Sequence, residues 1–292
     1  MLCMIKNKFT ATWVSHSSIS DYLACPRAYF LKNVYKNPDS GYKIQVVTPA
    51  LSLGSAIHEV LEELAGQPTE QRFKGNLIAK YEQVWQKNYA GKKGGFLSEE
   101  LEKKYFERGR AMLAKIIDKP GPLKNLAVRI KDELPNYYLS EEDDIILCGK
   151  LDWLEYFPGE DKVRIIDFKT STREENPDSL QLPIYYLLAK NCQKYNVSEI
   201  AYWYLDKDES PTPRDLPDEK EAREKLLTIA KKIKTARALQ TFKCPQQGCQ
   251  HCEPFEKILA GKGELVKKDA KMRREVYILP WSKEGEEQEE IL

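Results

Sequence analysis

Two aspartates and a lysine lie on either side of one tight turn in this chain. Gly149-Lys150-Leu151-Asp152 comes before the turn, and Ile165-Ile166-Asp167-Phe168-Lys169-Thr170 comes after it. The turn is predicted at Pro158-Gly159-Glu160-Asp161, because proline, glycine and aspartate favour tight turns. If its centre falls between residues 159 and 160, antiparallel strands place Asp152 opposite Asp167, with Cβ atoms roughly 4.5–5.5 Å apart. Asp167 and Lys169 then share one face of their strand.

This group of side chains suits the hydrolysis of a phosphodiester. Two carboxylates can hold a divalent cation, which polarises a phosphoryl oxygen and lowers the pKa of an attacking water. Hard oxygen ligands favour Mg²⁺ or Mn²⁺, and a lysine beside the cation can position the water and offset developing charge. The alternative is a solvated hairpin with ordinary surface charges, which explains most isolated Asp-x-Lys matches. Here Asp167 follows Val163, Ile165 and Ile166, and a charge pair at the end of an apolar strand favours the site.

Four cysteines have the positions expected of metal ligands. Cys244-x₄-Cys249-x₂-Cys252 lies more than two hundred residues after Cys25. Cys249 and Cys252 supply only two thiolates, whereas a closed tetrahedral or cubane site needs four. Cys25 and Cys244 each precede a proline, in turns or helix starts that can aim a thiolate. Thiolates suit iron–sulfur clusters and zinc equally. Zinc is therefore the main alternative, and an apolar group of reduced thiols is a weaker one.

The other cysteines and one histidine are interpreted differently. Cys148 falls in an expected strand and Cys192 in an expected helix, so both are predicted to be core residues. Cys3 lies in a terminal segment and receives no interpretation. His251 is a weaker candidate ligand than the four cysteines.

The composition limits where such a protein can act. The 292 residues are 41% hydrophobic and can form one large core or two small ones. The 46 basic and 45 acidic residues leave a net charge of +1, so any contact with nucleic acid must come from a local groove. No apolar run is long enough to span a membrane, and Met1–Thr12 lacks the features of a secretory signal. We therefore expect a cytoplasmic protein, in which the seven cysteines do not form disulfides.

The pattern of apolar residues predicts the elements that position these groups. One or two short helices are expected within Ser17–Tyr35, capped by Ser17 or Ser18, with Pro26 in the first turn of the second. Leu53, Ile57, Leu61 and Leu64 recur at helical spacing, and Gly66 follows as a stop. Further helices are expected at 71–90, 98–118, 179–194 and 218–239, and strands near Leu126 and at 145–157, 162–170 and 199–205. Helices on both sides of a short mixed sheet give an α/β class.

Four short motifs, in order, resemble a known family. They are Gly54-x₃-His58, Gly149-x₂-Asp152, Asp167-Phe168-Lys169-Thr170 and Gln181-x₃-Tyr185, and Cys25-Pro26-Arg27-x-Tyr29 precedes them. Their order and approximate spacing are similar to those of RecB-like PD-(D/E)XK nucleases, including CRISPR-associated exonucleases. The resemblance covers about residues 16–256.

The resemblance implies a fold and a set of site residues. The fold is a restriction-endonuclease-like core. His58, Asp152 and Asp167 would be metal ligands, with the Phe168 carbonyl a fourth, and Lys169 would be the catalytic lysine. Gln181 and Tyr185, which share a helix face, would orient the DNA backbone or the lysine, although Gln181 could instead be merely exposed, just before a helix that begins near Leu182. Gly54 would leave room beside the site, and Glu133 would match an acidic family position.

The resemblance also implies a [4Fe–4S] cluster held by Cys25, Cys244, Cys249 and Cys252. The family usually places its last cysteine further along, where this chain has Ile258 and Leu259, so Cys244 is the available substitute. The expected organisation is a single nuclease domain over 1–262, with a helical part at 16–118, a core at about 126–205 and a cluster segment at 240–256. Residues 263–292 are expected to be a charged tail, in which Val276–Leu279 could add an edge strand.

The expected function is that of a metal-dependent DNA nuclease. The resemblance implies an exonuclease on single-stranded DNA or DNA ends, in repair, recombination or CRISPR adaptation, with a helicase or a CRISPR integrase as a possible partner. One alternative is a catalytically silent, nuclease-like subunit that binds DNA ends or serves as a scaffold. Another is a zinc-stapled RNA-processing enzyme. Intact Asp152, Asp167 and Lys169 favour the enzyme over the silent subunit.

Overall fold

The computed structural model describes residue 8, residues 10–130, residue 132 and residues 134–280. Cys3 and Glu133 lie outside these described residues, as does most of Met1–Thr12. Within the described part, no helix has both the length and the apolar character needed to cross a bilayer.

A four-stranded mixed sheet carries the aspartates. It contains β5 (Trp153–Phe157), β6 (Lys162–Lys169), β7 (Asn196–Tyr204) and β8 (Thr212–Arg214), in that spatial order. The β5–β6 and β7–β8 pairs are antiparallel, and β6–β7 is parallel. The parallel pair is joined through helix α6 (Gln181–Cys192), as a parallel connection requires. This architecture confirms the predicted α/β class with a short mixed sheet flanked by helices.

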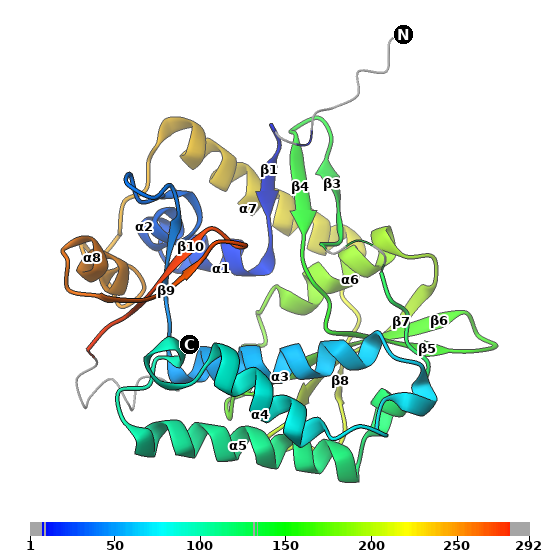
Figure 1. Cartoon of the computed structure of the whole chain (residues 1–292). Helices are drawn as coiled ribbons and strands as arrows, with labels where there is room; N and C mark the ends of the chain where they lie inside the picture. The colour runs from blue at the N-terminus through cyan, green and yellow to red at the C-terminus, as the bar shows by residue number, and fades with distance from the viewer. Residues whose placement is uncertain (1–7, 9, 131, 133, 281–292) are drawn as a thin grey trace.

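The two faces of this sheet pack against different layers of helices (Figure 1). Strand residues alternate between the faces, so Ile165 packs with α6, whereas Ile166 and Phe168 pack with the opposite layer. That opposite layer consists of α3 (Pro49–Ala65), α4 (Leu77–Asn88) and α5 (Glu99–Asp118). Gly66 ends α3 as predicted. Helix α4 begins later than expected because the Asn76 side chain caps it by accepting a hydrogen bond from Ala79 N (3.0 Å).

A second sheet separates the strand predicted at 145–157 into two. Strands β1 (Thr12–Val14), β4 (Ile145–Cys148) and β3 (Asn136–Ser140) form it in the order β1-β4-β3, and β5 belongs to the four-stranded sheet. The chain leaves β4 at Gly149, where a Cβ would lie 2.9 Å from Leu188 Cδ1 on α6. A side chain at this position would require Leu188 to shift. The strand expected near Leu126 is an isolated bridge between Ala127 and Glu155.

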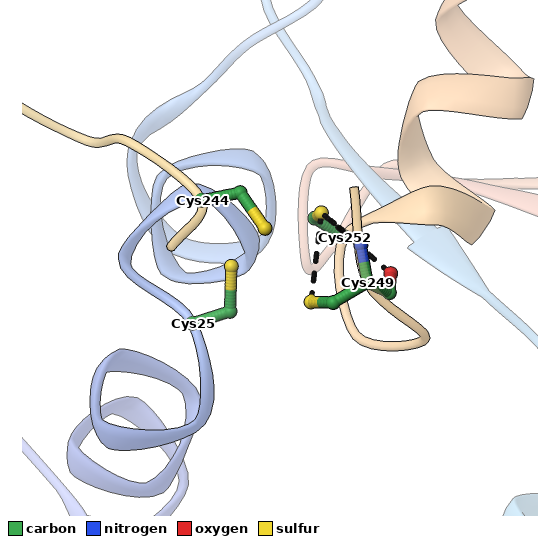
Figure 2. A group of neighbouring side chains, drawn as sticks. All are labelled: Cys25, Cys244, Cys249 and Cys252. Carbon is green, nitrogen blue, oxygen red and sulfur yellow. Dashed lines mark hydrogen bonds between the residues drawn. The ribbon is translucent and has the colours of Figure 1, made fainter. Parts of the chain in front are cut away.

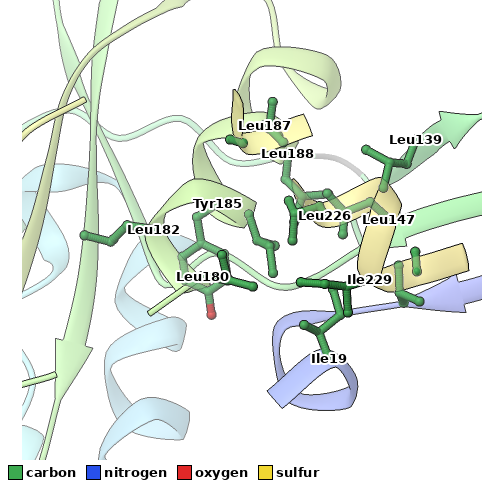
Figure 3. Packing of buried hydrophobic residues seen from close by; sticks show 14 of the residues in the cluster. Ile19, Leu139, Leu147, Leu180, Leu182, Tyr185, Leu187, Leu188, Leu226 and Ile229 are labelled. Atoms are coloured by element: carbon green, nitrogen blue, oxygen red, sulfur yellow. The ribbon is translucent and has the colours of Figure 1, made fainter. Parts of the chain in front are cut away.

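One apolar core packs the second sheet against helices α1 (His16–Ala24), α6 and α7 (Glu219–Leu239). Figure 3 shows Leu188 of α6, Leu147 of β4, and Leu226 and Ile229 of α7 in one buried cluster, with Ile19 of α1 beside Ile229. Helix α1 is capped by Ser15 and not by Ser17 or Ser18. Ser15 accepts from Ser18 N, and the Ser18 hydroxyl accepts from Ser15 N, so Ser18 occupies the third helical position of a capping box. Helix α2 (Pro26–Tyr29) begins at Pro26, as predicted, and continues into a π-helical turn at Phe30–Val34.

A third sheet pairs a segment from the first fifty residues with a segment near the C-terminal end of the described chain. Strands β2 (Lys43–Val46), β10 (Arg274–Ile278) and β9 (Glu264–Asp269) form it in the order β2-β10-β9, and helix α8 (Glu253–Leu259) lies beside it (Figure 1). The segment expected to be a charged tail therefore contains a hairpin. Its second strand is central, not an edge strand, because Val276, Ile278 and Leu279 are buried and β10 also pairs in parallel with β2.

The close packing of α5 on α3 and α4 gives a first prediction. A Cβ on Gly109 would lie 2.2 Å from the hydroxyl of the fully buried Tyr81 and 3.0 Å from Leu53. Alanine would improve helix propensity by about 1 kcal/mol, but overpacking costs about 1–3 kcal/mol. We expect Gly109→Ala to lower the free energy of unfolding, measured by urea denaturation. Gly75→Ala is the control, because a Cβ there meets no atom within 4 Å. A Gly109→Ala protein as stable as the wild type would contradict this account of the helical layer.

Candidate active site and four-cysteine centre

The register of β5 and β6 places the two aspartates side by side. The strands pair from Trp153↔Ile166 to Phe157↔Lys162, so the predicted alignment is confirmed. Asp152 directly precedes β5, and the same register continued by one residue puts it opposite Asp167. Its Oδ2 accepts a hydrogen bond from the backbone N–H of Phe168 (2.9 Å), which fixes the carboxylate beside the end of β6.

Asp167 has an unusual electrostatic environment. Burial and the neighbouring Asp152 carboxylate raise its pKa to about 8. Its Oδ2 is buried and accepts no hydrogen bond from the described residues. The Lys169 ammonium lies 3.2 Å from this oxygen as an ion-pair partner. Two adjacent carboxylates with one oxygen lacking a donor form a set that a divalent cation fits, because the cation would coordinate that oxygen.

His58 approaches this pair from α3. Its Nδ1 lies 3.1 Å from Asp152 Oδ1. Burial opposes protonation of His58, but the Asp152 carboxylate outweighs it and raises the pKa to about 9. Gly54, one turn earlier, lets the helix approach the end of β6, since a Cβ there would lie 3.3 Å from Thr170 Oγ1. The room expected beside Gly54 is therefore present.

Lys169 is surrounded by three polar partners. Its ammonium donates to Gln181 Oε1 and lies 3.0 Å from the Glu175 carboxylate, in addition to Asp167. Burial disfavours the charged form, but Asp167 and Glu175 outweigh that effect and raise the pKa of Lys169. Lys169 therefore keeps its positive charge in the cleft.

Gln181 is the first residue of α6 and is buried, so the structure does not support an exposed side chain outside the helix. Its Nε2 donates to Asp167 Oδ1 (3.0 Å) and to the Tyr185 hydroxyl (3.2 Å). Because its Oε1 also accepts from Lys169, one amide connects the aspartate, the lysine and α6. Pro183 is compatible with this start because it falls within the first turn, where no intrahelical N–H donor is required.

Three residues near the site were not found from the sequence. Glu62 lies one turn after His58, and ligand atoms of Glu62, His58 and Asp152 all lie within 4.8 Å of one another. Its spacing of four from His58 was an available signal. Glu175 and His16 come from a loop and from the start of α1, and neither belongs to a motif. Only the fold brings them to Lys169.

All the candidate active-site residues line one cleft of about 240 Å³. Its lining consists of His58, Asp152, Asp167, Phe168, Lys169, Thr170, Ser171, Glu175, Gln181 and Tyr185. The end of β6 is fixed there by Arg108 on α5, which donates to the Thr170 carbonyl (2.8 Å) and to Asp206 (2.8 Å). The arrangement can hold a cation next to a fixed ammonium group.

The four cysteines form a separate centre. Cys25, Cys244, Cys249 and Cys252 have sulfur atoms that all lie within 4.8 Å of one another. Figure 2 shows Cys25 between α1 and α2, Cys244 on the segment after α7, and the other two on the loop before α8. Burial raises the pKa of Cys25 and raises that of Cys252 to about 12, so a metal would have to displace protons from these thiols. The predicted convergence is confirmed.

Other contacts hold the same segments together. Arg27 of α2 and Glu256 of α8 form an ion pair (2.6 Å) beside the cysteines.

The other cysteines in the described part of the chain do not belong to this centre. Cys148 is buried in the core, whereas Cys192 is only half-buried. His251 does not belong to the group of four ligand atoms.

Comparison with known proteins identifies the family. The family model described as the PD-(D/E)XK nuclease superfamily matches residues 13–254. This chain belongs to that superfamily. No curated protein matches it. Among solved structures, the chain is similar to the crystal structure of a candidate exonuclease from Eubacterium rectale, with 12% identity and a TM-score of 0.47, over 93% of this chain and 97% of that one.

The four-cysteine centre gives a second prediction. We expect Cys25→Ser to remove the bound metal and to lower the melting temperature, because the ligands come from both ends of the chain and metal binding contributes to folding. Iron, sulfide and zinc would be measured on protein purified without oxygen, together with the absorbance near 400 nm. Cys192→Ser is the control. Full metal content in the Cys25→Ser protein would rule out Cys25 as a ligand.

His16 gives a third prediction, on pH. Burial, followed by the Lys169 ammonium, lowers its pKa to about 4 from the usual 6.5. Between these values the unfolded chain binds more protons than the folded one, so this residue's contribution to stability is lost as pH falls from about 6.5 to 4. The loss is on the order of 2–3 kcal/mol. We expect His16→Gln to flatten the fall in unfolding free energy over that range, measured by urea denaturation. Above pH 7 the two curves should run parallel. Equal slopes at acidic pH would contradict a half-buried, neutral His16.

Proposed function

We propose that this protein is a divalent-cation-dependent deoxyribonuclease, acting as an exonuclease on single-stranded DNA or DNA ends. Membership of the PD-(D/E)XK nuclease superfamily supports the nuclease class. The observation that carries the proposal is the buried Asp167 carboxylate, opposite Asp152 and 3.2 Å from the Lys169 ammonium, with one oxygen that accepts no hydrogen bond within the described part of the chain. Two carboxylates buried side by side are costly for a purely structural hairpin, so their presence with a histidine and a lysine supports a functional site.

The residues of the cleft fit a divalent cation. Asp152, Asp167, His58 and the Phe168 carbonyl would hold Mg²⁺ or Mn²⁺. When bound, the cation would polarise the phosphodiester and lower the pKa of a water. The raised pKa of Asp167 means that its proton must leave before it can act as a ligand. Acidic solution should therefore oppose activity.

The chain's own residues then position the reactants. Lys169 presents an ammonium that can donate to the attacking water or to a phosphoryl oxygen. Gln181 keeps that ammonium and Asp167 in fixed positions through its two hydrogen bonds. Tyr185 supports Gln181 from the next turn of α6. Glu175 shares the ammonium, and a phosphate arriving in the cleft would compete with its carboxylate.

The four-cysteine centre completes the proposal. We assign it a structural [4Fe–4S] cluster, with zinc as the alternative, and no role in hydrolysis. Reduced cysteines suit a cytoplasmic protein. A role in DNA repair, recombination or CRISPR adaptation, beside a helicase or an integrase, rests on the family resemblance alone.

The fourth prediction tests the catalytic residues. Asp167→Ala and Lys169→Ala should each reduce Mn²⁺-dependent degradation of labelled single-stranded DNA by at least about 100-fold. The first change removes a ligand of the cation, and the second removes the ammonium that offsets charge on the developing phosphorane. Circular dichroism should show an unchanged fold. Lys162→Ala is a matched control at the exposed start of the same strand, where the lysine pairs with Glu160.

Two results would argue against this mechanism. A Lys169→Ala protein with full activity would exclude the lysine from catalysis. A wild-type protein that binds DNA ends without cleaving them, in either Mg²⁺ or Mn²⁺, would favour the silent subunit.

A further inference from the structure

Two grooves adjoin the candidate active site, and they differ in charge. The first is about 620 Å³ in volume and reaches the site at Asp152. Its lining carries the carboxylates of Glu59, Glu62, Glu63, Asp132 and Asp152 against two cations, Arg129 and Lys150, and Lys150 is paired with Glu62. Such a lining repels phosphate groups. A nucleic-acid strand is therefore not expected to leave the cleft along this groove.

The second groove is about 280 Å³ in volume and lies between the start of α1, β2 and α8. Basic side chains dominate its lining, with Lys32, Lys43 and Arg274 against one carboxylate, Asp21. Asp21 is already occupied by Lys32 (2.8 Å) and by the Asn33 amide (3.0 Å). Lys43 and Arg274 are left as the cations of this groove, which we call the Lys43 groove.

Lys43 lies in an excess of positive charge. It is the register partner of Arg274 in the parallel β2–β10 pair. Burial, and then repulsion from Arg274, Arg237 and Lys36, lowers its pKa. Within the described residues Lys43 forms no ion pair, and Arg274 donates only to the Gln45 amide (3.2 Å). Neighbouring cations without a carboxylate partner are destabilising by themselves, so an anion from outside the chain would relieve the repulsion.

Two helices contribute residues both to the Lys43 groove and to the surroundings of the active site. Ser17 and Leu51 line the groove. Ser17 follows His16, which lies close enough to Lys169 and Glu175 for their charges to shift its pKa. Leu51 is 49% exposed and lies seven residues before His58 on α3, about 10 Å along the helix axis. Gly54, between them, touches Thr170 at the end of β6. Helices α1 and α3 thus place the groove near the cleft, and a single strand of DNA several nucleotides long is the occupant that could reach both.

We propose that the Lys43 groove binds the phosphates of the single strand whose end lies in the catalytic cleft, through Lys43 and Arg274. This inference rests on the proposed nuclease function and names a binding site for its substrate. Lysine and arginine contacts to phosphate carry no sequence information. The groove should therefore bind strands of any sequence, and binding should weaken as salt increases.

The test measures binding of fluorescein-labelled oligothymidylate by anisotropy, with full-length protein and EDTA to prevent cleavage. The variant is Lys43→Gln with Arg274→Gln. Lys103→Gln with Lys225→Gln is the matched control, since both lysines are exposed on α5 and α7 and neither forms an ion pair in the described part of the chain. We expect the groove variant to raise the dissociation constant roughly ten-fold at moderate salt and to reduce the slope of log K against log salt by about 1.4, for two lost contacts to a single strand. The control should behave as the wild type.

The outcomes separate this inference from the proposed function. If the wild type binds and degrades the oligonucleotide and the groove variant matches the control in affinity and salt slope, the Lys43 groove is not the binding site. If the groove variant loses affinity while its salt slope stays at the wild-type value, the loss is not of phosphate contacts and the inference is also overturned. If the wild type neither binds nor degrades the strand, the proposed nuclease function fails. Melting temperatures are measured in parallel, and Lys43→Gln alone replaces the double variant if that protein is unstable.

Discussion

The antiparallel pairing of β5 with β6 is the constraint on which the candidate site depends. Because side chains alternate along a strand, a slip of one residue would move Asp167 to the other face of the sheet. The observed register keeps Asp167 and Lys169 toward α6 and turns Ile166 and Phe168 toward α3. The same strand therefore contributes to the hydrophobic core on one face and holds the charged groups of the cleft on the other. Burying the two carboxylates costs folding free energy, and the packing of the apolar face of β6 offsets that cost.

The sequence predicted this part of the structure because the determinants are local. Turn residues at 158–161 set the register, and strand periodicity assigned Asp167 and Lys169 to one face. The four cysteines were also found, because a metal site limits the residue types that can form it. Local patterns failed where tertiary contacts decide. Glu175 reaches Lys169 from a loop with no periodicity, and Gly149 interrupts a predicted strand because α6 passes close to its backbone.

The C-terminal hairpin illustrates the same limit. Its composition is charged, and the local pattern therefore indicated a tail with an edge strand. Burial of Val276 and Ile278 depends on β2, whose residues lie more than two hundred positions earlier. No window of local sequence contains that information. The Lys43 groove also depends on this long-range pairing, since Lys43 and Arg274 become neighbours only when β2 pairs with β10.

The pairing of β2 with β10, and of Cys25 with the three later cysteines, also has a consequence for how the protein is made. During translation, Cys25 and β2 leave the ribosome well before Cys244 and β10 exist. At about 5–20 residues per second, β2 waits roughly 10–45 s for its parallel neighbour. Throughout that interval the unpaired edge of β2 can pair with other chains, and the thiol of Cys25 is exposed to oxidation. A nascent chain of this protein should therefore depend on chaperones and on a reducing environment until its last hundred residues emerge.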